Sequence, residues 1–285
     1  MAKHDPTRTL TAVNKAEASC RARLKAAQTQ VLALIKPALA VNAEYSFVLD
    51  EQRLLALGAD IRAIVDEQML VTEGGGIWLF EGYVKPAYIA GAGRAFSNIT
   101  AQSSTYATLR PNIMSVLMSA PFQNRMGLLR ARVFEEMAGF SGELGDKLAA
   151  TLTRGVGNGL GAIEIANQLV QNFDVTQYRA ERIARTEITT ALRRGRMDES
   201  DAASESIGLE IKLMHISAFS PTSREWHKSR HGLLFTSDEQ RLWWSVDGNS
   251  INCMCSVIEV IIGTNGEPLA PGLLTRAQTI KDKNT

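Results

Sequence analysis

The chain has 285 residues, of which 45% are hydrophobic and 21% charged, and its formal net charge at neutral pH is +1. This composition is typical of a globular protein with enough apolar material for one large or two modest domains. The near-neutral balance excludes a protein that coats nucleic acid with its whole surface, so any DNA contact is expected to be local. Three cysteines, one far from the other two, indicate a reducing compartment rather than a secretory disulfide framework.

Neither a signal peptide nor a membrane anchor is expected. The N-terminal stretch has no continuous apolar segment followed by a cleavage pattern. No window of about 18 apolar residues occurs in the chain, so we expect no membrane-spanning role.

The first half of the chain is predicted to be helical. Good helix formers, with apolar residues at spacings of three and four, indicate long helices over residues 9–39, 51–73 and 115–137. A run of three glycines, residues 74–76, ends the second of these. Small residues between positions 87 and 95 predict that a helix packs closely against a neighbour, within the protein or, alternatively, in an oligomer.

Two groups of glycines in the middle of the chain are candidate breaks between helices. Gly139, Gly142 and Gly145 mark a predicted domain boundary. The segment "RGVGNGLG", residues 154–161, invites comparison with a phosphate-binding loop. No Lys-Ser or Lys-Thr follows it and no strand pattern precedes it, so it is predicted to be a turn between two short helices.

In the C-terminal part of the chain, the sequence pattern changes from that of helices to that of strands. Residues 176–208 have a helical pattern, whereas "LEIKLMHIS" (209–217) and "SVIEVIIG" (256–263) have the alternating or β-branched pattern of strands. The tail from residue 264 is polar and contains two prolines, so we expect a loosely packed extension.

The predicted fold class is therefore α+β, predominantly α. A long helical N-terminal region precedes a small α+β C-terminal domain with a short antiparallel sheet. The predicted division of the chain is into residues 1–145, 146–263 and a tail, 264–285.

Arginines gather on one side of the helix predicted over residues 176–208. At about 100° per residue, five of them share a third of the circumference: Arg179, Arg182, Arg185, Arg193 and Arg196. The opposite side is apolar and holds Ala180, Ala184, Ile188 and Ala191. The arginine face is either a plain solvated surface or a contact for duplex DNA phosphates or an acidic partner.

Two histidines and two cysteines near the C-terminus are candidate zinc ligands: His227, His231, Cys253 and Cys255. Zinc prefers four nitrogen or sulfur ligands, but structural sites more often use a C-x2-C or C-x4-C spacing than this C-x-C. The alternative is that the cysteines are reduced residues at the start of a strand and that the histidines form ordinary hydrogen bonds. No hydrolase motif accompanies them, so we expect no enzymatic activity and no cofactor other than this candidate zinc ion.

Three segments in fixed order carry a family resemblance: "YRAERIARTEITTALRRGR" (178–196), "SREWHKSRHG" (223–232) and "DGNSINCMCS" (247–256). Together they resemble the phage Mu F-like minor head protein family, also called head morphogenesis proteins, over about residues 146–262. By this resemblance, Arg185, Thr186 and Glu187 fall on the family's central helix motif. Its C-terminal motif falls on His227, Gly232, Asn252, Cys253 and Cys255. Many members have a further cysteine shortly before the histidine, and "SPTSREWH" has none.

The resemblance implies a non-enzymatic minor head protein of a tailed phage, present in the virion near the portal and in the host cytoplasm during assembly. Its implied partners are the portal protein, the major capsid or scaffold protein, and the double-stranded DNA that is packaged or ejected there. The alternative is a DNA-binding module that uses the arginine-rich helix. No membrane partner is expected.

Overall fold

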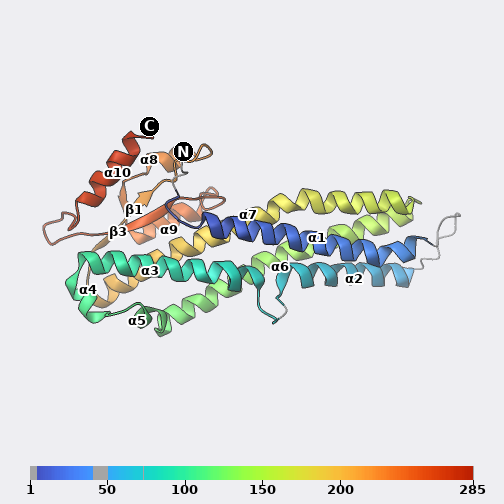
Figure 1. Ribbon diagram of the computed structural model, residues 1–285, viewed down its shortest axis with the longest axis horizontal. Coiled ribbons are helices and arrows are strands. Elements are labelled where there is room, and N and C mark those ends of the chain that lie inside the picture. Colours follow the sequence, from blue (N-terminus) through green and yellow to red (C-terminus); the bar gives the residue numbers. More distant parts are fainter. Residues whose placement is uncertain (1–4, 41–50, 73, 285) are drawn as a thin grey trace. The chain divides into compact units, whose positions relative to one another are not determined.

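The computed structural model describes residues 5–40, 51–72 and 74–284 (Figure 1). The described chain is predominantly helical with a small antiparallel sheet near the C-terminus, which confirms the predicted fold class. Its N-terminal helical elements are α1 (Leu10–Ala40), α2 (Glu51–Leu70), η1 (Phe80–Val84), α3 (Lys85–Gln102), α4 (Ser104–Leu109) and α5 (Met114–Leu117). Two long helices follow, α6 (Ala120–Gly157) and α7 (Ala162–Ile207).

The chain divides into two compact units, each built from separate stretches of sequence. Unit 1 contains Met1–Val13, Gly82–Leu129 and Arg185–Thr285, and unit 2 contains Asn14–Glu81 and Arg130–Ala184. Helices α6 and α7 each contribute residues to both units. The units therefore do not follow the predicted division at residue 145.

The predicted N-terminal helices are confirmed as α1 and α2, but the third predicted helix has the wrong bounds. After the short α5, helix α6 begins at Ala120 and passes through all three glycines of the predicted boundary. A glycine inside a helix costs about 1 kcal/mol relative to alanine. Burial of Phe140 and Leu144 on the same helix offsets that cost. The predicted turn is confirmed, because α6 ends at Gly157 and Gly159 has a positive φ of 69°. The two short helices predicted on either side of it are wrong, since α6 has 38 residues and α7 has 46.

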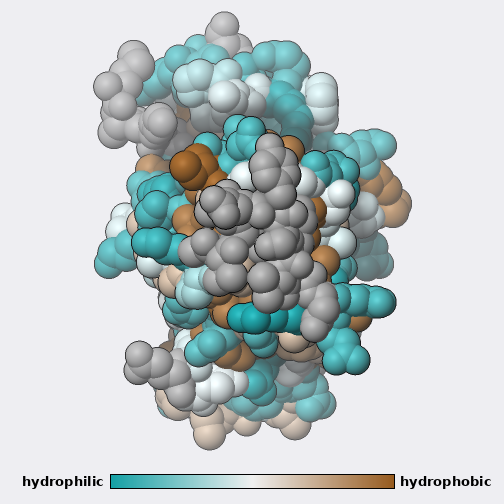
Figure 2. All heavy atoms as spheres, turned by 90° about the vertical axis from the view of Figure 1, so that its right-hand side faces the viewer, coloured by the Kyte–Doolittle hydropathy of each residue, from teal (hydrophilic) through white to brown (hydrophobic). Residues whose placement is uncertain are grey.

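Unit 2 buries a regular apolar stripe on each of its helices. Val31 and Ile35 of α1, Ile61 and Val65 of α2, and Leu148 of α6 are almost fully buried. On the face shown in Figure 2, the coloured residues are mostly hydrophilic, and hydrophobic ones stand among them in small groups. Among the described residues, no helix is both long and apolar enough to cross a membrane.

Unit 1 contains a three-stranded antiparallel sheet in the order β2-β1-β3. The strands are β1 (Ile211–Ile216), β2 (Leu234–Phe235) and β3 (Ser256–Ile261), and β1 and β3 confirm the two predicted strands. The short helices between them are α8 (Glu225–Ser229) and α9 (Ser237–Ser245), and neither was predicted. A capping box of Thr236 and Glu239 fixes the start of α9.

Both faces of the sheet are covered. Because side chains alternate along a strand, Leu213 and Val257 share one face, where they pack with Met197 of α7 and Trp244 of α9. The other face carries Met214, Ile216 and Val260, which pack with Ala277. Ala277 belongs to α10 (Gly272–Asp282), so the prediction of a loosely packed tail is wrong. Ala277 is buried on the sheet, and Leu273 and Leu274 pack beside it as partly buried side chains.

Helices α3 and α7 approach each other closely within unit 1. A Cβ atom built on Gly91 would lie 2.1 Å from the Leu192 carbonyl oxygen, and one on Gly195 would lie 2.2 Å from the Tyr88 carbonyl oxygen. Both distances are far below any real contact, so the two backbones touch at this crossing. The small residues predicted to allow close helix packing serve an intramolecular contact here.

We predict that Gly91→Ala and Gly195→Ala each lower the free energy of unfolding by about 3 kcal/mol, because the two helices must separate to admit the methyl group. Gly93→Ala is the matched control, since its added Cβ would have no atom within 4 Å beyond the adjoining backbone of its own helix. It should raise stability by up to about 1 kcal/mol through helix propensity. Urea unfolding followed by circular dichroism measures all three, and equal effects at Gly91 and Gly93 would contradict the close crossing.

Candidate functional site

The predicted arginine face of α7 is not a continuous exposed surface. Arg193 is 1% exposed and Arg196 is 6% exposed, and the apolar residues predicted on the opposite side are buried as well. The interpretation of these two arginines as residues offered to solvent or DNA is therefore wrong. The helix pattern showed which residues share a side, but it could not show that the C-terminal domain packs on that side.

Arg196 forms a buried ion pair with Glu259 of β3. Its Nη2 donates to Oε2 at 2.6 Å and its Nε donates to Oε1 at 2.9 Å, so the pair is bidentate. The Asn98 amide of α3 also donates to Glu259, at 3.0 Å to Oε2. A bidentate arginine–carboxylate pair with its remaining acceptors satisfied can be stable inside a protein. It holds the sheet against α7 and α3.

Arg193 is held by carbonyl oxygens rather than by a carboxylate. Its Nη1 donates to the Cys253 carbonyl at 2.9 Å and the Cys255 carbonyl at 3.4 Å, and its Nη2 donates to the Thr190 hydroxyl at 2.9 Å. The guanidinium also stacks over the Trp244 ring, 4.6 Å from its centroid. Burial lowers the pKa of Arg193 from its ordinary value.

The two segments that carry the family resemblance contact each other. Arg185 Nη1 donates to the Asn252 side-chain oxygen at 2.9 Å, and the Asn252 backbone amide donates to the Thr186 hydroxyl at 3.0 Å. Asn252 has a positive φ of 59°, a conformation that asparagine tolerates better than most residues. The central helix motif therefore fixes the conformation of the loop that precedes β3.

The remaining two arginines of the predicted face belong to unit 2. Arg179 forms a two-bond ion pair with Glu143 of α6, with one of the bonds at 3.0 Å. Arg182 is exposed, and its guanidinium lies 5.9 Å from the Tyr178 ring centroid.

The four predicted zinc ligands do not come together. His231 Nδ1 accepts from the Ser217 backbone amide at 3.0 Å, and its Nε2 lies 3.1 Å from the Ala277 carbonyl. A backbone donor and a backbone acceptor thus use both ring nitrogens, and His231 serves to join β1 and α10. Its assignment as a zinc ligand is wrong.

The other three candidates form a buried cluster, which we call the His-Cys cluster: His227, Cys253 and Cys255. The ligand atoms of these three residues all lie within 4.8 Å of one another. Nδ1 of His227 is 3.5 Å from the Cys253 sulfur and 3.6 Å from the Cys255 sulfur. These separations match the nitrogen–sulfur spacing of about 3.6 Å expected around tetrahedral zinc.

Arg224 determines which ring nitrogen of His227 carries the proton. Its Nη1 lies 3.1 Å from His227 Nε2. Because a guanidinium can only donate, Nε2 must accept and the ring proton must sit on Nδ1, facing the two sulfurs. A metal ion on Nδ1 would require the opposite tautomer, with an Nε2 proton aimed at the Arg224 guanidinium. The described residues also supply no fourth His, Cys, Asp or Glu ligand. The spacing fits zinc, but the hydrogen bonds around it do not.

The same geometry favours the ionised, thiolate form of one of the two sulfurs. A hydrogen bond from the Cys255 thiol lowers the pKa of Cys253 well below its ordinary value, with Arg193 and His227 adding to the effect. The same bond, together with burial, raises the pKa of Cys255. The Cys255 backbone amide also donates to the Cys253 sulfur, at 3.4 Å. A Cys253 thiolate would thus be a counter-charge for the buried Arg193 guanidinium.

Several residues of this site were not predicted. Glu259 is a carboxylate within an otherwise apolar strand, and that position was the available signal for a buried basic partner. His215 is fully buried between Trp243 and Trp244, and burial lowers its pKa to about 3. Arg230 is sandwiched between aromatic rings, and no sequence signal indicated that contact.

We predict that the chain, purified without a histidine tag, contains far less than one zinc ion per molecule, because Nδ1 of His227 carries a proton. Elemental analysis measures the metal content. Cys255→Ser reports on the His-Cys cluster, and Cys20→Ser is the matched control because Cys20 is a buried cysteine of unit 2. One zinc ion per chain that is lost in Cys255→Ser and retained in Cys20→Ser would contradict the assigned tautomer.

Comparison with known proteins identifies the region that contains this site. Residues 146–258 match the family described as Phage Mu protein F like protein. No curated protein and no solved structure matches the chain. The matched segment includes both motif segments that meet at Asn252, and its bounds lie close to those of the resemblance seen in the sequence. Residues 146–258 of the chain are therefore similar to the Phage Mu protein F like family, a family of phage head morphogenesis, which supports the resemblance seen in the sequence.

Proposed function

We propose that this chain is a minor head protein of a tailed phage that acts in head assembly at the portal vertex and catalyses no reaction. The observation that carries the proposal is the junction between the two family motifs. Arg185 and Thr186 bind Asn252, so the motif residues hold the loop before β3 in place. The virion is the expected location of the mature protein, and the host cytoplasm its location during assembly.

The His-Cys cluster supports a non-catalytic role. A cysteine nucleophile needs an activating base and access to a substrate. Cys253 and His227 are in contact, but both are buried, and Cys255 lies beside them with similar burial. Hydrogen bonds and packing account for this arrangement, which stabilises the loop before β3.

A group of exposed apolar side chains on unit 1 is suited to a protein partner. We call it the tryptophan surface and define it by Trp226, Val246 and Ile251, which are 54%, 42% and 43% exposed. Trp226 is anchored because its indole nitrogen donates to the Asn249 side-chain oxygen at 2.9 Å. The Asn249 backbone amide in turn donates to the Val246 carbonyl, at 3.0 Å. Rigidly held exposed tryptophans are frequent hot spots of protein interfaces.

The portal protein is the proposed occupant of the tryptophan surface, with the major capsid or scaffold protein as further candidates. Direct DNA binding through α7 has less support, because Arg193 and Arg196 are buried in the unit 1 core. An exposed arginine such as Arg182 alone would provide only a weak, salt-sensitive phosphate contact.

We predict that co-expression with the portal protein of the same phage yields a complex that persists through size-exclusion chromatography at moderate salt. Trp226→Ala should weaken the complex at least about tenfold, as expected for a truncated hot-spot residue. Ile163→Ala is the matched control, because Ile163 is an exposed apolar residue on the unit 2 part of α7. Absence of a complex with the wild-type chain would refute portal association, and equal loss in both variants would refute the tryptophan surface.

A further inference from the structure

A cavity of about 900 Å³ lies in unit 1 between the sheet, α3, α10 and the N-terminal segment. Its floor is apolar and includes Met214 and Ile216 of β1 and Ile258 of β3. Leu273 and Ile280 extend the apolar surface along α10. Volumes of this size are typical of ligand sites in proteins. The cavity is separate from the His-Cys cluster and from the tryptophan surface, none of whose residues line it.

Arginines surround this apolar floor. Arg8, Arg94, Arg196 and Arg276 line the cavity, together with a single carboxylate, that of Asp5. Asp5 already accepts hydrogen bonds from the Thr7 and Leu10 backbone amides, both at 3.0 Å. Arg196 is neutralised by Glu259, as described above. Arg94 Nη1 donates to the Thr7 carbonyl, which does not neutralise its charge. Four arginines and two carboxylates, those of Asp5 and Glu259, leave the cavity lining with a net positive charge.

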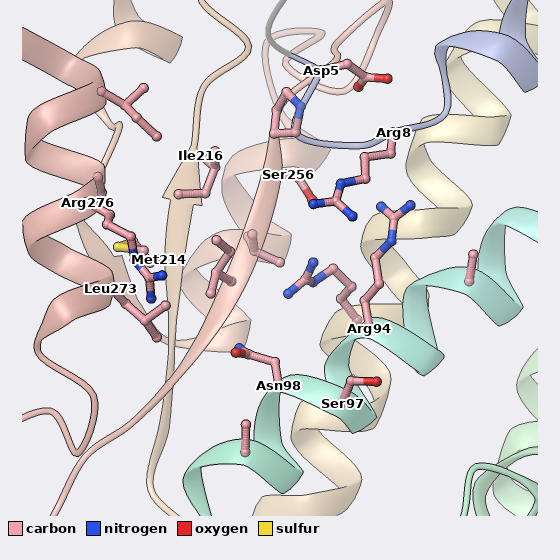
Figure 3. Close-up of a pocket in the computed structure, with 18 of the residues that line it drawn as sticks. Asp5, Arg8, Arg94, Ser97, Asn98, Met214, Ile216, Ser256, Leu273 and Arg276 are labelled. Atoms are coloured by element: carbon pink, nitrogen blue, oxygen red, sulfur yellow. The ribbon is translucent and has the colours of Figure 1, made fainter. Parts of the chain in front are cut away.

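Ser256 supplies an independent sign of a missing ligand. It is 1% exposed and lines the cavity, and its hydroxyl has no hydrogen-bond partner among the described residues. A buried hydroxyl without a partner costs about 1–3 kcal/mol. Figure 3 shows the Arg8 side chain extending toward Ser256, with Arg94 directed into the same space. A ligand oxygen placed there would meet two cationic donors and the free hydroxyl.

The cations lie on two sides of the cavity. Figure 3 shows Arg276 on α10, beside Met214 and Leu273, across the apolar floor from Arg8 and Arg94. Arg276 is exposed, and its Nε donates to the Gly272 carbonyl at 3.2 Å. A ligand that pairs with arginines on both sides would carry an anionic group at each end and apolar groups between them. Duplex DNA does not have this pattern, because its backbone contacts are phosphate contacts without an apolar anchor. A single-headed amphiphile would leave one side unpaired.

We propose that this cavity binds a short peptide segment of a partner protein in which acidic residues flank an apolar stretch. One carboxylate binds Arg8, Arg94 and the Ser256 hydroxyl, the apolar side chains lie on Ile258, Leu273 and Ile280, and the second carboxylate binds Arg276. The site does not depend on which head component supplies the peptide. It is thus independent of the portal contact proposed for the tryptophan surface.

The test uses the full chain and a panel of fluorescein-labelled hexapeptides with glutamate at both ends and leucine, isoleucine or valine between. Fluorescence anisotropy should show saturable binding for members of this panel. Replacing both glutamates by glutamine, or the apolar residues by serine, should weaken binding at least about tenfold, the loss expected for charge-assisted hydrogen bonds. A panel with no binder, or binders that are insensitive to the glutamine change, would overturn the proposal.

Variants of the chain locate the binding. Arg8→Glu and Arg276→Glu should each weaken binding at least about tenfold, because each charge reversal repels one carboxylate. Ser256→Ala should weaken it about fivefold without loss of stability, since its hydroxyl has no partner within the described protein. Arg130→Glu is the matched control, an exposed arginine of α6 outside the cavity. Wild-type affinity in Arg8→Glu and Arg276→Glu, or displacement of the peptide by a 20-base-pair duplex, would overturn the assignment.

Discussion

Burial of two arginines of α7 is the constraint on which the C-terminal module depends. A guanidinium can enter a protein interior only if its charge and its donors are satisfied. Arg196 meets that condition through a bidentate pair with Glu259, and Arg193 meets it through the carbonyl groups of Cys253 and Cys255. Both partners lie on or just before β3. The long helix therefore fixes where the third strand lies and how the loop before it is folded.

The remaining features of the module follow from this arrangement. Because Arg193 draws the carbonyl groups of the 253–255 segment inward, the two cysteine sulfurs face His227, and Arg224 then fixes the proton on that imidazole. Strand β3 is held between β1 and α3, which leaves its Ser256 end beside the arginine-lined cavity. The family motif residues thus hold the loop before β3 in place.

Much of the fold could be predicted from the sequence, but the role of its charged residues could not. Helical periodicity predicted α1 and α2, and alternation predicted β1 and β3, because those patterns depend on local geometry. The same periodicity correctly placed the five arginines on one side of α7. Whether that side meets water or a sheet depends on long-range packing, so Arg193 and Arg196 were misassigned. The zinc prediction failed at His231 for a similar reason. Spacing in sequence does not reveal that the imidazole of His231 lies against the Ala277 carbonyl of α10. The cavity is lined by six stretches of the chain that are far apart in sequence, so no sequence signal indicated it.

A double-mutant cycle at Arg196 and Glu259 tests the central claim most directly, with urea unfolding as the readout. If the pair locks α7 to β3, Arg196→Met and Glu259→Leu should each lower the free energy of unfolding by about 3–5 kcal/mol, because each leaves an uncompensated buried charge. The double variant should lose far less than the sum of the two. Arg62→Met at the exposed Arg62–Asp146 pair should cost less than about 1 kcal/mol. A cost at Arg196 no larger than that at Arg62, or additive losses in the double variant, would contradict the account.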